Sequence, residues 1–286
     1  MDMQVALIIP AAGASQRYKQ AKGGLHPGVQ RSKLDEDLGG RPVLQRTVEL
    51  FAKHETVGPL IATTIVAGPH DEETFAEFKL RHADRLGLLG AKLCRGGVTH
   101  RYESVAAALA FLKTLPEAGS ITHVAIHDAA RPCTPASLIE TIFAAAQKHP
   151  GVVPGVACSD TIKRIVIEQA EADIDPLAAI LGAAKGPAKR QWVTQTVERA
   201  GLVLVQTPQV FRWDVLRRAY EQRDLSSTDD ASLVERLFDT EKSQQRVLVV
   251  EGDARNIKIT TPDDLVLARA ILGVKGPDEK PAHLRF

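Results

Sequence analysis

The sequence predicts an α/β protein with a Rossmann-like, mainly parallel sheet, helices on both faces and an extended β-arm. The first 157 residues alternate apolar runs of strand length with amphipathic stretches of helix length, a pattern typical of parallel sheets covered by helices. The first run, VALIIP (5–10), is apolar at almost every position, as expected for a strand buried on both faces. Because ligands of such sheets bind outside the carboxyl ends of the strands, a functional site is expected at that edge.

The elements follow one another in the order that this fold requires. Apolar patterns predict further strands at 60–68, 91–97, the start of 122–132, and 151–157. Helices are expected between them, from Pro42 through His54 and at 71–86, 101–115 and 135–149. Proline is favoured in the first turn of a helix, and the acidic residues that open the second helix suit the positive end of a helix dipole.

Residues 162–197 break this rhythm. Strand-like IKRIVI and QWVTQTV flank a polar stretch that contains glycine and proline. We predict an inserted hairpin-like arm within a single domain of residues 1–274, because the segment has too few core positions to fold alone. Such an arm either packs on another subunit or forms a surface flap, and the sequence leaves both open. Beyond it the patterns predict helices at 213–222 and 229–238, a strand at 246–250, a helix from Pro262 and a flexible tail at 275–286.

Composition excludes several classes of protein. At 286 residues, with 44% hydrophobic residues and a net charge of +1, the chain has ample core and too little charge for a dedicated nucleic-acid or membrane-surface binder. Its three cysteines form no C-x-x-C pair, which favours a reducing, cytoplasmic environment over a disulfide framework. No apolar run approaches the roughly 18 residues of a membrane-spanning helix.

Small residues follow the first strand and predict a phosphate site. Ala11, Ala12 and Gly13 let the backbone approach a ligand closely, and successive N–H groups in such a loop form an anion-binding concavity. Arg17 adds fixed positive charge. The pattern matches neither a P-loop nor the G-x-G-x-x-G dinucleotide fingerprint. Two other loops, RGG (95–97) and HDAARP (127–132), also follow predicted strands, so all three are expected to converge at one edge of the sheet.

Two further segments carry candidate chemistry. Asp128 ends a buried strand, where it can hold a divalent metal or simply cap a turn, and Arg131 can bind a phosphate bidentately. His127 has no histidine partner at metal-ligand spacing, which favours a structural role. In NIKIT (256–260), alternation turns Lys258 away from its two isoleucine neighbours, either into solvent or into a cleft. Hydrolase motifs such as G-x-S-x-G and H-E-x-x-H are absent from the sequence.

The motifs together resemble those of the 2-C-methyl-D-erythritol 4-phosphate cytidylyltransferase family. The similarity covers about residues 5–272, and the motifs occur in family order: PAAGASQR, Lys33, the Gly96–Gly97 pair with Arg101 and Ser104, HDAARP, DTIKR, VERAGL, TPQ-x-F, TDDASLVE and NIKIT. The resemblance implies the sheet of the nucleotide-diphospho-sugar transferase type. It also implies an enzyme that uses Mg²⁺ to join CTP to methylerythritol phosphate, a polyol phosphate of the non-mevalonate isoprenoid pathway, with release of pyrophosphate.

The same resemblance implies a role for each matching residue. Arg17, Lys33 and Lys258 would act on the triphosphate and its transition state. Nucleotide contacts would come from Ala11, Ala12, Gly13, Gly97 and Ser104, the last two reading the cytosine edge. The acceptor would be bound by Asp128, Arg131, Thr161, Arg199, Thr207 and Thr228, and Asp128 would also help to place the metal. In the family the arm crosses to a partner subunit, so Thr161 and Arg199 would act in trans within a homodimer.

Some positions depart from the family pattern. The family usually has proline before the loop lysine and glutamine after it, where this chain has Ser32 and Leu34, and the preceding loop carries Lys19, Lys22 and Arg31 as rival cations. The glycine pair is followed by one extra residue before Arg101.

The alternative functions are a ribitol 5-phosphate cytidylyltransferase, a pyrophosphorylase that uses another nucleotide, and a nucleotide-binding module without turnover.

Overall fold

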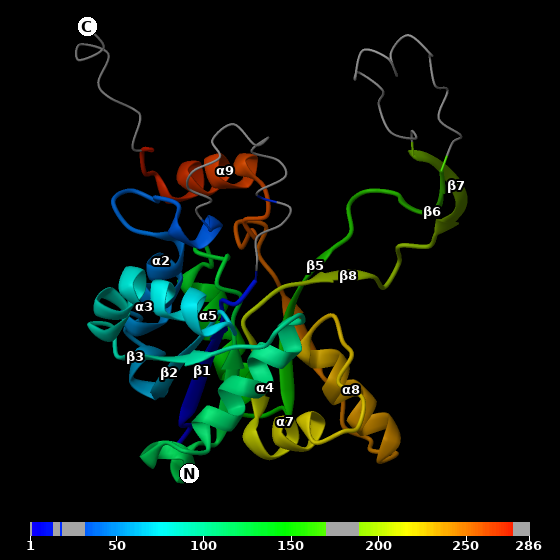
Figure 1. Ribbon diagram of the computed structural model, residues 1–286. Helices are drawn as coiled ribbons and strands as arrows, with labels where there is room; N and C mark the ends of the chain where they lie inside the picture. Colours follow the sequence, from blue (N-terminus) through cyan, green and yellow to red (C-terminus); the bar gives the residue numbers. More distant parts are fainter. Residues whose placement is uncertain (1, 14–17, 19–31, 170–188, 277–286) are drawn as a thin grey trace, which may run out of the picture. The chain divides into compact units, whose positions relative to one another are not determined.

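The computed structural model describes residues 2–13, 18, 32–169 and 189–276 (Figure 1). The chain divides into two compact units. The first lies within Met1–Val156 and Val205–Phe286, and the second within Ala157–Leu204. Residues 277–286 of the predicted tail (275–286) and the segment around Arg17 lie outside the described residues.

The first unit is built on a sheet with strand order β10-β5-β9-β4-β1-β2-β3. The strands are β1 (Val5–Pro10), β2 (Ile61–Gly68), β3 (Ala91–Arg95), β4 (His123–Ile126), β5 (Gly151–Ala157), β9 (Gln209–Arg212) and β10 (Leu248–Glu251). Neighbouring strands are parallel except at β9, which runs antiparallel to both β4 and β5. The predicted mainly parallel sheet is confirmed, and the inserted antiparallel strand is the feature that the apolar patterns did not reveal.

Helices cover both faces of this sheet, as predicted. Val5, Leu7 and Ile9 of β1 lie in one buried cluster, and Ala6 and Ile8 lie in another. The first cluster includes side chains of α2 (Val43–Ala52), α3 (Glu72–Gly87), α5 (Ala136–Ala146) and α9 (Pro262–Leu272). The second includes α4 (Arg101–Leu112), α7 (Trp213–Tyr220) and α8 (Asp230–Thr240), which lie together in Figure 1. In the part of the chain that is described, no helix is long and apolar enough to cross a bilayer.

Short 3-10 helices connect these elements: η1 (Lys33–Asp35), η2 (Gly58–Leu60) and η3 (Pro116–Ser120). Helix α9 begins where the sequence predicted, because the Thr261 hydroxyl accepts from the Asp264 N–H while Pro262 occupies the first turn. Pro42 immediately precedes α2 instead of standing in its first turn, a difference of one position.

The second unit contains an antiparallel pair, β6 (Ile162–Gln169) and β7 (Lys189–Val197). These strands agree with the predicted hairpin-like arm. Large apolar side chains of the pair are exposed, with relative accessibilities of 56% for Ile167, 51% for Trp192 and 63% for Val193. A short strand, β8 (Val203–Val205), follows in the chain. A role of the arm in dimer formation stays a prediction.

Candidate active site

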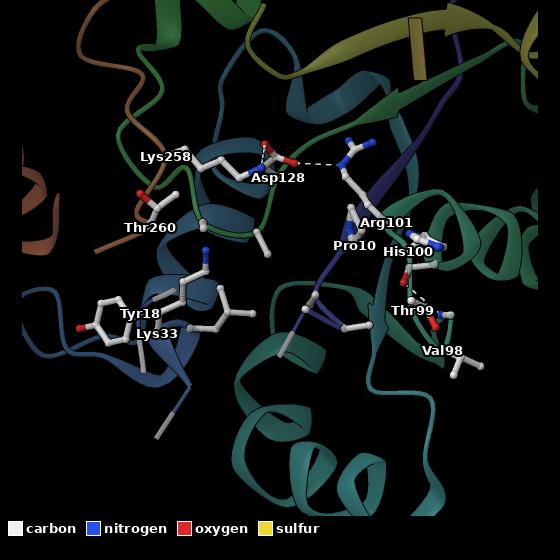
Figure 2. A pocket seen from close by; sticks show the side chains of 18 residues that line it. Pro10, Tyr18, Lys33, Val98, Thr99, His100, Arg101, Asp128, Lys258 and Thr260 are labelled. Carbon is white, nitrogen blue, oxygen red and sulfur yellow. Dashed lines mark hydrogen bonds and ion pairs between the residues drawn. The ribbon is translucent and has the colours of Figure 1, made fainter. Parts of the chain in front are cut away.

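A pocket of about 620 Å³ lies where the loops after β1, β3 and β4 meet (Figure 2). Its lining includes Pro10–Gly13, Gly97–Arg101 and Asp128–Ala130, together with Lys33 and Lys258. The predicted convergence of three loops at the carboxyl edge of the sheet is therefore confirmed. The volume is within the range of about 300–1,000 Å³ that is common for small-molecule sites.

The glycine pair after β3 is required by close packing. A Cβ on Gly96 would lie 2.6 Å from the Gly68 carbonyl oxygen, and one on Gly97 would lie 2.1 Å from the Cβ of Glu103. The Gly97 N–H donates to the buried Ser104 hydroxyl at 3.0 Å. The two residues expected to read the base are thus in contact with each other at the pocket, although their role toward a base stays a prediction.

The loop with the extra residue is held against the start of α4. The Glu103 carboxylate accepts from the backbone N–H groups of Thr99, at 2.7 Å, and His100, at 3.1 Å. The rings of His100 and Tyr102 stack with centroids 5.1 Å apart. These contacts give the longer loop a defined path along the pocket wall.

Asp128 is the centre of a cationic cluster. Its Oδ1 lies 3.1 Å from Arg101 Nε, and its Oδ2 lies 2.9 Å from Lys258 Nζ and 3.3 Å from Arg131 Nε. Burial raises the pKa of Asp128, but the three cations outweigh it and hold this pKa far below its ordinary value. Figure 2 shows Lys258 and Arg101 approaching the carboxylate from opposite sides. Three cations around one carboxylate leave an excess of positive charge, which suits an anionic ligand.

Arg101 also contacts a second carboxylate, that of Asp230. Its Nη1 lies 2.6 Å from Oδ2 of Asp230, which is only 1% exposed, and the Tyr220 hydroxyl donates to Asp230 Oδ1 at 2.6 Å. Burial lowers the pKa of Arg101, but the two carboxylates raise it above its ordinary value, so the guanidinium is permanently charged. The sequence marked Arg101 only as part of a motif and missed this role, because its partner Asp230 is 129 positions away in the chain.

Lys33 and Lys258 both reach the pocket. Lys33 Nζ donates to the carbonyl oxygen of Ile259 at 2.7 Å, and Ile259 is the residue that follows Lys258. Of the two orientations that alternation allowed for Lys258, the structure has the one into the cleft. Arg17 and the rival cations Lys19, Lys22 and Arg31 lie outside the described residues, so their predicted roles stay predictions.

Several expected ligands form a buried network behind the pocket. Thr207 is 4% exposed; its hydroxyl accepts from the Asp128 N–H at 3.0 Å and lies 3.2 Å from His127 Nδ1. Arg131 Nη1 donates to the Asn256 carbonyl oxygen at 2.6 Å. Burial lowers the pKa of His127 to about 4, and the structural role predicted for it is confirmed. Neither Thr207 nor Arg131 is among the lining residues of this pocket, and the binding of an acceptor by these two residues stays a prediction.

The remaining expected ligands lie elsewhere in the chain. Thr228 is exposed in the loop before α8. Thr161 and Arg199 belong to the second unit, in which an Arg199 guanidinium nitrogen donates to the Ser159 carbonyl oxygen. Binding of an acceptor by these three residues stays a prediction.

A mainly parallel α/β sheet with a cationic pocket outside its strand ends defines a protein of the nucleotide-binding class, and comparison with known proteins narrows it to a nucleotidyltransferase. The family model described as 2-C-methyl-D-erythritol 4-phosphate cytidylyltransferase matches residues 5–175 and 166–274. The chain belongs to this family.

Individual relatives agree with that assignment. The chain is 33% identical over 278 residues to the 2-C-methyl-D-erythritol 4-phosphate cytidylyltransferase of Geobacter metallireducens, covering 96% of this chain and 100% of the relative. It is 36% identical over 280 residues to the enzyme of the same name from Syntrophotalea carbinolica, covering 96% and 98%. Among solved structures, the Thermus thermophilus enzyme of that name matches with a TM-score of 0.60 and 29% identity over 95% of this chain and 100% of the other.

Proposed function

We propose that this protein transfers the cytidylyl group of CTP to 2-C-methyl-D-erythritol 4-phosphate, forming 4-diphosphocytidyl-2-C-methyl-D-erythritol and pyrophosphate for non-mevalonate isoprenoid synthesis. The observation that carries the proposal is the convergence of Lys33, Lys258 and Arg101 on one pocket around Asp128. Full-length similarity to relatives that bear this name supports the choice of nucleotide and acceptor.

The chemistry is an in-line displacement at phosphorus. A phosphate oxygen of the acceptor forms a bond to the α-phosphorus of CTP, and the bond from that phosphorus to the bridging oxygen of the β-phosphate breaks, so pyrophosphate leaves with the electron pair. No covalent enzyme intermediate is required. Catalysis then consists of positioning two anions and stabilising the charge that develops between them. Lys258 and Lys33, with Arg17, supply that positive charge.

The nucleotide would lie along the loops after β1 and β3. The backbone of Ala11, Ala12 and Gly13 would contact it, and Gly97 and Ser104 would read the edge of the base. Residue 97 must be a glycine because any side chain there would collide with Glu103, and this packing on α4 brings the Gly97 N–H to the Ser104 hydroxyl. A pyrimidine is the expected base.

A magnesium ion at this site would be carried largely by the substrate, because both oxygens of Asp128 already contact cationic side chains. Mg²⁺ is usually bound by one or two carboxylates together with substrate phosphates, and Asp128 is the one carboxylate among the described lining residues. Within those same described residues no group of three or more histidine, cysteine or acidic side chains is placed to hold a metal. Asp128 would hold the ion, and the ion would supply charge neutralisation of the triphosphate.

A homodimer and a cytoplasmic location are part of this proposal. The exposed apolar side chains of the β6–β7 pair support association with a second copy, since such residues seldom stay exposed together without a partner. Cys94, Cys133 and Cys158 are all free thiols, which supports a reducing compartment.

The test is pyrophosphate release from CTP and Mg²⁺ with two acceptors compared in parallel. We expect release with 2-C-methyl-D-erythritol 4-phosphate, little with ribitol 5-phosphate, and much less when ATP, GTP or UTP replaces CTP. Release with ribitol 5-phosphate alone would keep the chemistry and refute the proposed acceptor. If neither acceptor led to release of pyrophosphate, the proposed cytidylyltransferase activity would be refuted.

A further inference from the structure

We propose that Asp35 and His82 form a positioning pair that holds Lys33 in the pocket, acting through the short helix η1. The inference rests on the proposed function, because it assumes that Lys33 acts on the triphosphate. Neither Asp35 nor His82 lines the pocket. Their contribution would therefore be to fix the place from which the lysine reaches the ligand.

The end of the Lys33 side chain is attached to a rigid part of the site. Its Nζ donates to the carbonyl oxygen of Ile259 at 2.7 Å. Ile259 is fully buried, and its own N–H donates to the Ala130 carbonyl oxygen at 2.8 Å, two residues beyond Asp128. Figure 2 shows the amino group of Lys33 pointing toward the side of the pocket that carries Asp128 and Lys258. The location of η1 thus decides whether Lys33 can complete this cluster.

Helix η1 cannot keep that location by itself. It contains three residues, and a single helical turn is unstable without outside contacts, since nucleating a helix fixes several dihedrals for one hydrogen bond. The Ser32 N–H donates to Asp35 Oδ2 at 3.3 Å, and the Leu34 N–H donates to Ser32 Oγ at 3.3 Å. These bonds define the shape of the turn. They do not attach it to the rest of the molecule.

Beside the contacts of η1 with α2, an attachment comes from helix α3. His82 Nε2 lies 2.7 Å from Asp35 Oδ1, and the His82 side chain is 3% exposed. The His82 ring packs against the ring of Phe78, one helical turn earlier, with centroids 4.7 Å apart. One carboxylate therefore caps η1 with Oδ2 and joins it to a 16-residue helix with Oδ1. Leu34, 4% exposed, belongs to the same buried apolar cluster as Phe78.

The electrostatics favour an ionised Asp35. Burial raises the pKa of Asp35, but the hydrogen bond from His82 and the nearby charge of Arg81 outweigh it and lower the pKa below its ordinary value. Hydrogen bonds to an ionised acceptor are shorter and stronger than neutral ones, which agrees with the 2.7 Å separation. Arg81 Nε lies 3.7 Å from Asp35 Oδ1 and the Arg81 side chain is 47% exposed. This ion pair therefore holds Asp35 less firmly than the contact with His82 does.

The consequence for catalysis follows from the length of lysine. Its four-carbon stem is flexible, and a catalytic group must be held within about 0.5 Å of its working place. Loosening η1 would let the ammonium leave the cluster without disturbing α3, whose Phe78 and Leu86 remain in the core. We therefore expect loosening of η1 to lower turnover and CTP affinity, and we expect both losses to depend on the presence of Lys33.

Two substitutions at one site separate the hydrogen bond from the packing. His82→Gln keeps an N–H donor near the position of Nε2, whereas His82→Phe keeps a ring beside Phe78 and removes the donor. We expect His82→Phe to lower kcat about 10- to 100-fold and to weaken CTP binding, with His82→Gln retaining most of both. Leu80→Ala, at an 88% exposed position of the same helix, is the control that should change neither.

A double-mutant cycle decides whether the effect passes through Lys33. In a Lys33→Met background, His82→Phe should cause no further loss, because the group that it positions is already gone. An equal additional loss in that background would overturn the proposal, and so would unchanged kinetics of His82→Phe. If His82→Phe does not fold, Asp35→Asn takes its place in the cycle, since the amide keeps the shape and removes the charge.

The same cycle is measured by calorimetric binding of CTP with Mg²⁺ and no acceptor. This readout distinguishes the positioning pair from the proposed reaction. Wild-type protein that binds CTP and releases no pyrophosphate would refute the reaction, while non-additive binding losses would still support the pair. Additive binding losses would overturn the pair even in an active enzyme.

Discussion

Lys258 is the residue whose removal tests the catalytic cluster most directly. It lies in a segment that forms no strand, is 37% exposed, and pairs with an Asp128 that also contacts Arg101 and Arg131. Lys258→Ala should therefore leave the melting temperature nearly unchanged, because Asp128 keeps two cationic partners. Turnover should fall about 100- to 1,000-fold, the usual cost of losing a group that stabilises transition-state charge.

The measurement is pyrophosphate release beside a thermal melt of the same preparation. Lys53→Ala provides a matched control, because this lysine is half-exposed directly after the end of α2 and pairs with Glu49 away from the pocket. A variant at Lys258 with wild-type kcat would remove this lysine from the mechanism.

Individual side chains also show which parts of the site could be predicted. The small residues after β1 were recognisable because local pattern and strand position decide them, and Lys258 was recognisable from its motif although its segment forms no strand. The hydrogen bonds of Thr207 and Arg131 to Asp128, His127 and Asn256 could not be predicted, while their binding of an acceptor stays a prediction. Which partner a polar side chain chooses depends on distant segments, and no local spacing encodes that choice.

At the scale of elements, the start of α9 gives a pH-dependent prediction. Asp264 Oδ2 accepts from the Thr260 and Thr261 N–H groups, each at 2.8 Å, and Thr260 lines the pocket. Burial raises the pKa of Asp264, but the hydrogen bond from the Thr260 hydroxyl, at 2.7 Å, and those from the two N–H groups outweigh it and lower the pKa below its ordinary value. A lowered folded-state pKa contributes stability above the unfolded pKa of about 3.9, and that stability is lost as the pH falls through the folded value.

Asp264→Ala should therefore destabilise the protein by about 1 kcal/mol at neutral pH, as for other helix caps. The difference in melting temperature from wild type should be full at pH 6–7 and should shrink as the pH falls below about 4. Thermal melts across that range measure it. A difference that is constant down to pH 3 would show that the charge of Asp264 is not the source of the stability.

Elements were predicted more completely than their connections. Strands and helices of the first unit lie close to their expected positions, because hydrophobic periodicity and capping residues are local signals. The direction of β9 between β4 and β5 was not predicted, since strand pairing is settled by contacts far apart in sequence. Helix η1 was missed for a related reason: its anchor, His82, lies 47 positions after Asp35.

At the scale of the whole molecule, the net charge gives no sign of the cationic pocket. The chain carries 36 basic and 35 acidic residues, which excludes a generally cationic surface. The described part of the pocket nevertheless gathers Arg101, Lys258 and Lys33 around or near one carboxylate. The net charge of a whole chain therefore argues against binding of a nucleic acid or a membrane surface. It gives little information about a site for a small anionic ligand.

The homodimer proposal makes the last prediction, which concerns how two chains share a site. If Arg199 serves the pocket of the partner subunit, a Lys258→Ala chain and an Arg199→Ala chain should complement each other. In a mixed dimer one pocket has both defects, whereas the other combines an intact Lys258 with an intact Arg199. Dimers co-expressed with two different tags and purified on both should regain about half of the wild-type activity at low acceptor concentration.

Each parent homodimer should be far less active under the same conditions, because each of its pockets lacks one residue. A mixed dimer no more active than the mean of its parents would place Arg199 in the pocket of its own chain. Failure of the two tags to co-purify would refute the dimer itself, and the exposed apolar side chains of the β6–β7 pair would then need a different partner.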